Sequence, residues 1–63
     1  MKVYVAVLTY IVEGYEKFHH MEVVGTFKAR ADAERALDRE CEFIESNPMH
    51  MVTGGAISEQ WIE

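Results

Sequence analysis

The sequence predicts one α+β domain, residues 1–63, whose strands and helix follow each other in the order ββαβ. Residues 2–12, KVYVAVLTYIV, are rich in β-branched and aromatic types and show no helical period, whereas residues 29–46 repeat apolar side chains at helical spacing. The first two strands form a hairpin, and the helix then returns the chain so that the last strand lies antiparallel beside the first. This order predicts a three-stranded antiparallel sheet of order 2-1-3 with the helix packed on one face.

The first strand, residues 2–12, is apolar on both of its alternating faces, as is typical of a central strand that is covered on two sides. The two faces read Val3, Val5, Val7, Thr9, Ile11 and Tyr4, Ala6, Leu8, Tyr10, Val12. One helix can cover only one of them, and the sequence does not decide which. We therefore expect the uncovered face to bind a second copy, as a homodimer, or another protein.

A hairpin joins the first strand to the second. Gly14 lies at the reversal, where a tight turn needs a positive φ, and residues 17–27 resume strand-like composition. Two adjacent histidines and Glu22 interrupt the apolar alternation, which favours an edge strand, and Gly25 indicates a bulge near its end.

The helix is predicted over residues 29–46. Its apolar stripe consists of Ala29, Ala33, Ala36, Leu37, Cys41 and Ile44. The alanines allow a close approach to the sheet, and Asn47-Pro48 ends the helix. No side chain at residues 28–29 can cap the first turn, so this turn depends on Asp32 near the positive end of the helix dipole. The last strand follows, with a bulge expected at Gly54-Gly55.

Charge and length narrow the function classes. Eleven acidic against six basic residues give a formal net charge of -5, which disfavours nucleic acid as a partner and is compatible with a basic protein. The apolar run is too short to span a bilayer and follows no basic leader, so we expect a cytoplasmic protein without membrane contact. One cysteine excludes an internal disulfide, and Cys41 in the helical stripe is expected to act as a small apolar residue.

The opening MKVYV and the segment VVGTFKARADAERAL resemble small uncharacterised ββαβ domains of prokaryotes and phages. Those domains combine a hydrophobic strand, a Gly-x-Phe/Tyr-Ser segment and an Ala-rich helix start. The matching positions are Gly25, Phe27, Ala33, Glu34 and Ala36. The resemblance covers about the first two thirds of the chain, departs from the pattern at Lys28-Ala29, where a capping Ser would stand, and implies a fold without an activity.

An acidic ridge runs along the exposed side of the predicted helix. It consists of Glu34, Asp38 and Glu42 at i, i+4 and i+8, with Glu45 beside them. The ridge is either an ordinary solvated surface or a docking surface for a basic partner. The candidate partner-binding residues are this ridge and, if their side of the first strand is the uncovered one, Tyr4, Leu8 and Tyr10.

Glu40 is the anomalous residue of the helix, because it falls inside the apolar stripe between Leu37 and Ile44. A charge there is costly to bury without a partner. Glu40 is either a functional acid or an architectural one that reaches water or bonds a Tyr or His of the sheet.

No metal, cofactor or catalytic residue is predicted. His19 and His20 are adjacent in a strand and point to opposite faces, so they cannot both bind one ion, and His50 stands alone. No nucleophile elbow, phosphate loop or dinucleotide fingerprint occurs, which makes an enzyme the less favoured interpretation.

The leading hypothesis is a small acidic binding or inhibitory protein, encoded by a phage and directed against a host defence in the host cytoplasm. It would act through the acidic ridge and the uncovered sheet face. The alternative is a dimeric small-molecule-binding protein or enzyme, with a pocket between subunits lined by Tyr4, Tyr10, Trp61 and a histidine.

Overall fold

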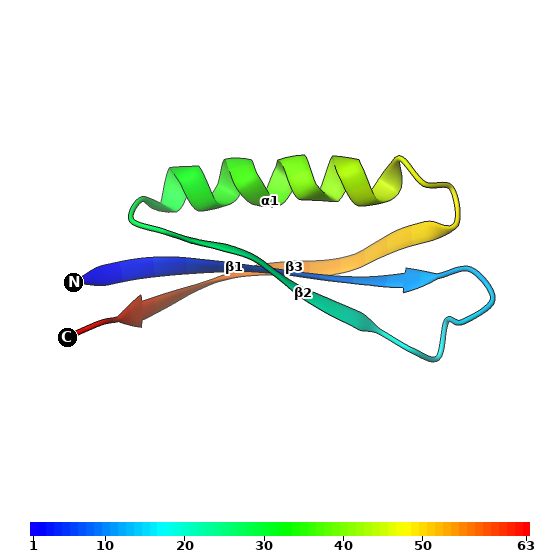
Figure 1. The fold of residues 1–63 in the computed structure, drawn as a ribbon, viewed down its shortest axis with the longest axis horizontal. Helices are drawn as coiled ribbons and strands as arrows, with labels where there is room; N and C mark the ends of the chain where they lie inside the picture. Colours follow the sequence, from blue (N-terminus) through cyan, green and yellow to red (C-terminus); the bar gives the residue numbers. More distant parts are fainter.

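A computed structural model describes residues 1–63. The elements, in chain order, are β1 (Lys2–Val12), β2 (His20–Phe27), α1 (Arg30–Glu45) and β3 (His50–Trp61). The three strands form one antiparallel sheet of order β2-β1-β3, which confirms the predicted ββαβ fold. Helix α1 lies along one side of the sheet, and no element covers the other side (Figure 1).

The packing of α1 identifies the covered face of β1. Leu8 is 1% exposed, and its partner across the sheet is Gly55. A Cβ atom on Gly55 would lie 3.3 Å from Cδ2 of Leu37 in α1, so Leu8 and Gly55 face the helix. We call this side the helix face, with Tyr4, Ala6, Leu8, Tyr10 and Val12 of β1, and the opposite side the open face, with Val3, Val5, Val7, Thr9 and Ile11.

A bulge in β2 changes the face on which its first half lies. Ala6 pairs with Gly25 and the next residue of β1, Val7, pairs with Val23, so Val24 is the extra residue. Because side chains alternate along a strand, one extra residue exchanges the faces of everything that precedes it.

The consequence is visible in the register of β2. Glu22 pairs with Leu8, and His20 pairs with Tyr10, so both lie on the helix face together with Phe27. Met21 and Val23 lie on the open face, and they are 74% and 63% exposed.

A second bulge interrupts β3 at the expected glycine pair. Thr9 pairs with Gly54 and Tyr10 with Val52, so Thr53 is the extra residue. The Thr9 hydroxyl donates a hydrogen bond to the Gly54 carbonyl (3.2 Å), and the Thr53 hydroxyl donates to Thr9 Oγ1 (3.3 Å). The hydroxyl of Thr9 therefore has partners within its own chain.

Helix α1 begins and ends within one residue of the predicted limits. Ala29 is the N-cap, and no side chain makes a capping hydrogen bond there, as the sequence predicted. At the other end the Ser46 hydroxyl donates to the carbonyl of Phe43 (2.6 Å). Only Ala33 and Ile44 of the helix are buried.

The core is small. Five of the 63 residues are buried: Val3, Ala6, Leu8, Ala33 and Ile44. A single sheet with one helix on it leaves most apolar side chains partly in water, which is the expected outcome for a two-layer domain of this size.

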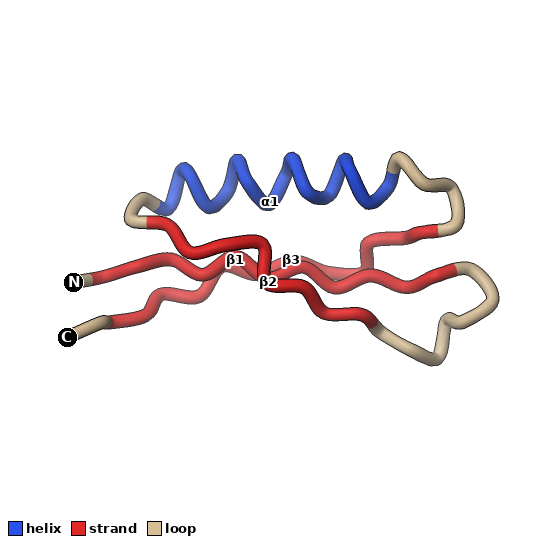
Figure 2. The backbone as a smooth tube through the Cα atoms, viewed as in Figure 1, coloured by secondary structure: helices blue, strands red, loops and turns tan.

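The connections separate into two ends of the molecule (Figure 2). The β1–β2 turn, in which Gly14 has φ of +90°, lies at the same end as the link from α1 to β3. Both chain termini lie at the other end. There the Ile62 amide donates to the Met1 carbonyl (2.7 Å), and the Met1 amino group donates to the Ile62 carbonyl (2.8 Å).

Candidate functional site

The acidic ridge lies on the solvent side of α1, and its four residues are exposed. Arg30 Nε lies 3.3 Å from Glu34 Oε1, and Arg35 pairs with Asp32, so the first half of the helix is largely neutralised. Asp38, Glu42 and Glu45 form no salt bridge, and the last turn contains no basic residue. Unpaired negative charge is therefore concentrated where the helix dipole is also negative.

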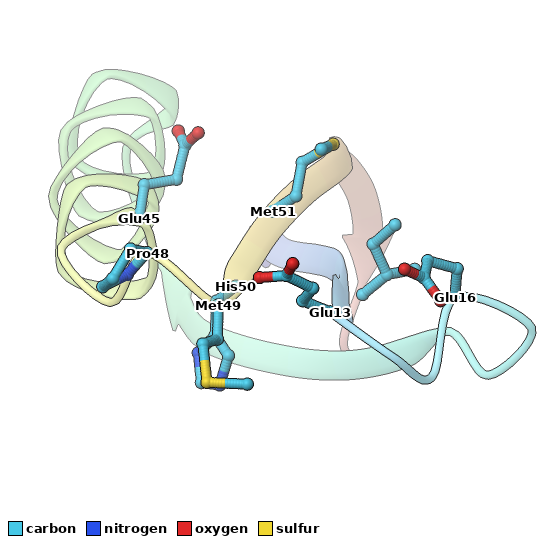
Figure 3. A pocket seen from close by; sticks show the side chains of 8 residues that line it. Glu13, Glu16, Glu45, Pro48, Met49, His50 and Met51 are labelled. Atoms are coloured by element: carbon cyan, nitrogen blue, oxygen red, sulfur yellow. The ribbon is translucent and has the colours of Figure 1, made fainter.

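An acidic cavity of about 450 Å³ adjoins this end of the helix (Figure 3). Glu45 comes from α1, Glu13 and Glu16 from the β1–β2 turn, and His50 from β3. The other residues that line the cavity are apolar: Ile11, Pro48, Met49 and Met51. Three carboxylates from two separate segments thus surround a recess with apolar walls.

Two hydrogen bonds organise the turn beside this cavity. The Glu13 amide donates to the Met49 carbonyl (2.7 Å) and ties the turn to the link between α1 and β3. The Gly14 amide donates to Glu16 Oε1 (3.1 Å), and this bond, together with one from the backbone of Glu16, lowers the pKa of the Glu16 carboxyl. Glu16 therefore stays ionised at neutral pH.

Glu13 and Glu16 are not among the site residues that the sequence predicts. A signal existed, because in a ββαβ chain the first turn and the end of the helix lie at the same end of the sheet. The sequence could therefore have predicted that Glu13 and Glu16 of that turn lie near the acidic ridge. The cavity between them depends on side-chain packing, which the pattern does not specify.

Cys41 is half-exposed and contacts the ridge. Its Sγ lies 3.2 Å from Glu45 Oε1, and this hydrogen bond, with burial and the neighbouring carboxylates, raises the pKa of the thiol. A raised pKa keeps the sulfur protonated at neutral pH, and a protonated thiol is a poor nucleophile.

Phe43 is the exposed aromatic residue of the helix, with 70% of its surface in water. It follows Glu42 directly, and its carbonyl is bonded by Ser46 at the helix end. Phe43 is thus an exposed aromatic side chain among carboxylates that form no salt bridge.

Glu40 faces another acid instead of a Tyr or His. It is half-buried on the helix, and Glu22 of β2 lies opposite on the helix face. Burial raises the pKa of the Glu22 carboxyl most, and the charge of Glu40 and a hydrogen bond with it raise the pKa further. The β2 bulge brings these two carboxyl groups together, which is why strict alternation along the strand did not reveal the pair.

A histidine lies on each side of Tyr10 on the helix face. The His20 ring stacks on Tyr10 with centroids 5.1 Å apart, and the His50 ring is tilted at 5.4 Å. No group of three or more His, Cys, Asp or Glu side chains is arranged to hold a metal ion. His20 and His50 therefore pack as aromatic neighbours of Tyr10.

The three partner-binding candidates of the first strand lie on the helix face. Leu8, at 1% exposed, is buried beneath α1, so the prediction that it contacts a partner is wrong for the folded chain. Tyr4 and Tyr10 are half-buried on the same side. The apolar side chains available to a partner are instead those of the open face, such as Val23.

Near the termini, Lys2 links three neighbours of the sheet. Its Nζ lies 3.1 Å from Glu59 Oε2, and 5.8 and 6.0 Å from the ring centroids of Tyr4 and Trp61. The hydrogen bond and the charge of Glu59 raise the pKa of Lys2.

A second cavity of about 340 Å³ is lined by Val12, Tyr15, Phe18 and His20. Tyr4, Tyr10 and Trp61 line neither cavity.

Comparison with known proteins finds no match to this chain among protein-family models, curated proteins or solved structures. In the structure, α1 lacks the length and apolar character that a membrane-crossing helix needs.

Proposed function

We propose that this protein is a small protein-binding domain that engages a basic surface of another protein through the C-terminal half of α1. One observation carries the proposal: Asp38, Glu42 and Glu45 are unpaired at the end of a helix where cations would be stabilising. Unpaired carboxylates at this end of a helix destabilise the unbound protein, and they are expected where a partner supplies the cations that would pair with them.

The neighbouring surface suits the same partner. A Lys or Arg side chain has an apolar stem and a cationic head, and the acidic cavity offers apolar walls with carboxylates among them. Phe43 adds an exposed aromatic side chain, the type that most often anchors protein interfaces. Charge would therefore speed the encounter, and the aromatic contact would slow dissociation.

An inhibitory role follows from this mode of binding. A domain that covers a basic surface blocks whatever that surface normally binds. If the chain is encoded by a phage, as its resemblance to small phage domains suggests, the target would be a host defence protein in the cytoplasm. That assignment rests on analogy.

The test compares proteins captured from a lysate of the encoding organism, or of its host, by matched variants. We expect Glu42→Gln with Glu45→Gln to lose most of a partner that the wild type retains, and Phe43→Ala to lose it as well. Glu59→Gln with Glu63→Gln makes the same charge change at the other end of the molecule and should retain it. Equal capture by both double variants would contradict the proposal.

A stronger substitution tests the electrostatic mechanism with the captured partner in purified form. Reversal of Glu34, Asp38 and Glu42 to Lys should abolish binding while the fold persists. For the wild type, the association rate should fall by about tenfold or more between low and physiological salt. A rate that does not depend on salt would show that the ridge takes no part in the encounter.

A further inference from the structure

We infer that the second cavity, lined by Val12, Tyr15, Phe18 and His20, binds a trimethylammonium group that a lysine side chain of a partner protein carries. Three aromatic rings and a branched apolar side chain form its walls, and none of the four residues is a carboxylate. Its volume of about 340 Å³ falls within the range of about 300 to 1,000 Å³ that is usual for ligand sites. The choice of a protein as the carrier rests on the proposed function, whereas the choice of the cation rests on the cavity and its turn.

Hydrogen bonds of the backbone hold three of the four lining residues in place. The Tyr15 amide donates to the Val12 carbonyl (2.9 Å), and the Phe18 amide donates to the Tyr15 carbonyl (3.0 Å). The fourth residue, His20, stacks on Tyr10 with ring centroids 5.1 Å apart and an angle of 18° between the ring planes. A cavity whose walls are fixed before binding loses less entropy when a ligand enters.

The surroundings of the cavity favour a cation. The faces of aromatic rings carry a negative potential, and cations bind over them. Glu13 and Glu16 lie in the same turn, where Lys17 is the only base, within a chain of formal net charge -5. Of the lysines and arginines of the chain, only Lys2 lies over aromatic rings, and it does so at the other end of the molecule. The chain therefore does not fill the cavity with a cation of its own.

The chemistry of the walls favours a methylated cation. They offer almost no polar surface, so an ammonium or guanidinium group that entered would give up hydrogen bonds to water without replacing them. A trimethylammonium group has no N–H donor, and its methyl groups gain free energy by leaving water. An unmethylated lysine or an arginine instead finds carboxylates in the acidic cavity. The two cavities thus differ in the cation that each one suits.

The position of the cavity favours a ligand that a protein presents. The β1–β2 turn extends past the end of α1 (Figure 1), and Tyr15 and Phe18 are 63% and 65% exposed. Sites for free small molecules usually enclose about 70 to 90% of the ligand surface, which two largely exposed walls do not achieve. A methylated lysine in a basic segment gains the missing affinity from its neighbours, because Glu13 and Glu16 alternate along the turn with Tyr15 and Phe18.

Titration of the full chain with choline tests the cavity, with the nuclear magnetic resonance shifts of Tyr15 and Phe18 as the readout. The neutral isostere 3,3-dimethyl-1-butanol has the shape of choline without its charge, and ethanolamine has a cation without the methyl groups. Choline should bind at least about fivefold more tightly than either compound. Equal binding of the isostere or of ethanolamine would overturn the inference. The titrations are made at pH 8, because a protonated imidazole would repel the cation.

Substitution of one ring tests the contact between cation and aromatic face. Phe18→Leu keeps an apolar side chain and should weaken choline binding about fivefold, whereas Phe18→Trp should strengthen it, because indole is the best ring for a cation. The matched control is Trp61→Leu, which removes an exposed aromatic ring at the other end of the molecule and should leave choline binding unchanged. If Phe18→Leu also left choline binding unchanged, this cavity would not be the site.

Two synthetic peptides test the carrier, each with a lysine between two arginines, unmodified in one and trimethylated in the other. The trimethylated peptide should bind at least about tenfold more tightly than choline and about fivefold more tightly than the unmodified peptide. A trimethylated peptide that bound no better than choline would refute a protein carrier. These titrations do not involve capture through α1, so their failure would leave the proposed function standing, and failed capture would leave the choline result standing.

Discussion

At the scale of single residues, the pair Glu22 and Glu40 is the feature most at odds with stability. Two carboxyl groups meet between the helix and the sheet, where neither has a cation beside it. The raised pKa of Glu22 means that the folded protein holds this proton more tightly than the unfolded chain. The associated stabilisation is complete below the ordinary value of 4.5 and is lost as the pH rises through the raised pKa.

Substitution of Glu22 by Gln should therefore stabilise the protein at neutral pH. We expect the free energy of unfolding at pH 7 to rise by about 0.5 to 1 kcal/mol, and the gain to disappear near pH 4, where Glu22 of the wild type is also neutral. Urea denaturation from pH 4 to pH 8 measures this.

Two further variants interpret that result. Glu40→Leu should stabilise by a similar amount if Glu40 is only architectural, whereas loss of partner binding at unchanged stability would identify it as a working acid. Glu42→Gln removes one exposed charge from the same helix without touching Glu22, and it should change the free energy of unfolding at pH 7 less than Glu22→Gln does.

At the scale of elements, the sequence predicted the limits of β1 and α1 within a residue, because length and periodicity are strong signals there. It did not predict the faces of β2. A strict alternation groups Met21, Val23 and Phe27 on one side, and the single extra residue Val24 separates the first two from Phe27. Gly25 indicates that β2 contains a bulge, but which residue is the extra one depends on how β2 pairs with β1.

The site was likewise predicted only as far as local spacing along the chain determines it. The acidic ridge follows from helical spacing and was predicted, whereas the cavity forms where a turn and a helix end meet in space. Leu8 was assigned to a partner surface because both faces of β1 are apolar. The burial of Leu8 and the packing of Leu37 against Gly55 show which face the helix covers.

The N-terminus of α1 offers a prediction at this scale. Ala29 has the extended backbone of an N-cap, with φ of -118° and ψ of 136°, but no side chain to bond the free amides of the first turn. Ala29→Ser should stabilise the protein by about 1 kcal/mol, equivalent to a rise of about 4 to 8 °C in melting temperature.

The matched control is Ala31→Ser, which places the same hydroxyl inside the helix. It should lower the melting temperature slightly, because serine is a weaker helix former than alanine there. If both variants melted alike, the first turn would not be limited by its missing cap.

At the scale of the whole molecule, charge is distributed unevenly. Carboxylates from α1 and from the β1–β2 turn gather at one end, and the helix dipole adds to their potential. Mutual repulsion of these groups opposes the compact state and is screened by salt. The acidic end is therefore the part of the fold most sensitive to ionic conditions.

We expect the melting temperature to rise when sodium chloride is increased from low to physiological concentration. Glu42→Lys with Glu45→Lys should raise the low-salt melting temperature and reduce the salt effect, because it places cations at the negative end of the helix. Glu63→Lys, at the far end of the chain, should change the salt effect much less. Calorimetry at two salt concentrations makes the comparison.

The reciprocal hydrogen bonds between Met1 and Ile62 hold the two ends of the chain side by side. A short Gly-Ser linker could therefore join them, and the chain could be reopened at the link between α1 and β3, as a circular permutant with the same sheet. The reopened permutant would place its new ends beside the acidic cavity. A fluorophore or affinity tag attached there would report directly on that surface, whereas one on the natural ends lies at the opposite end of the molecule (Figure 2).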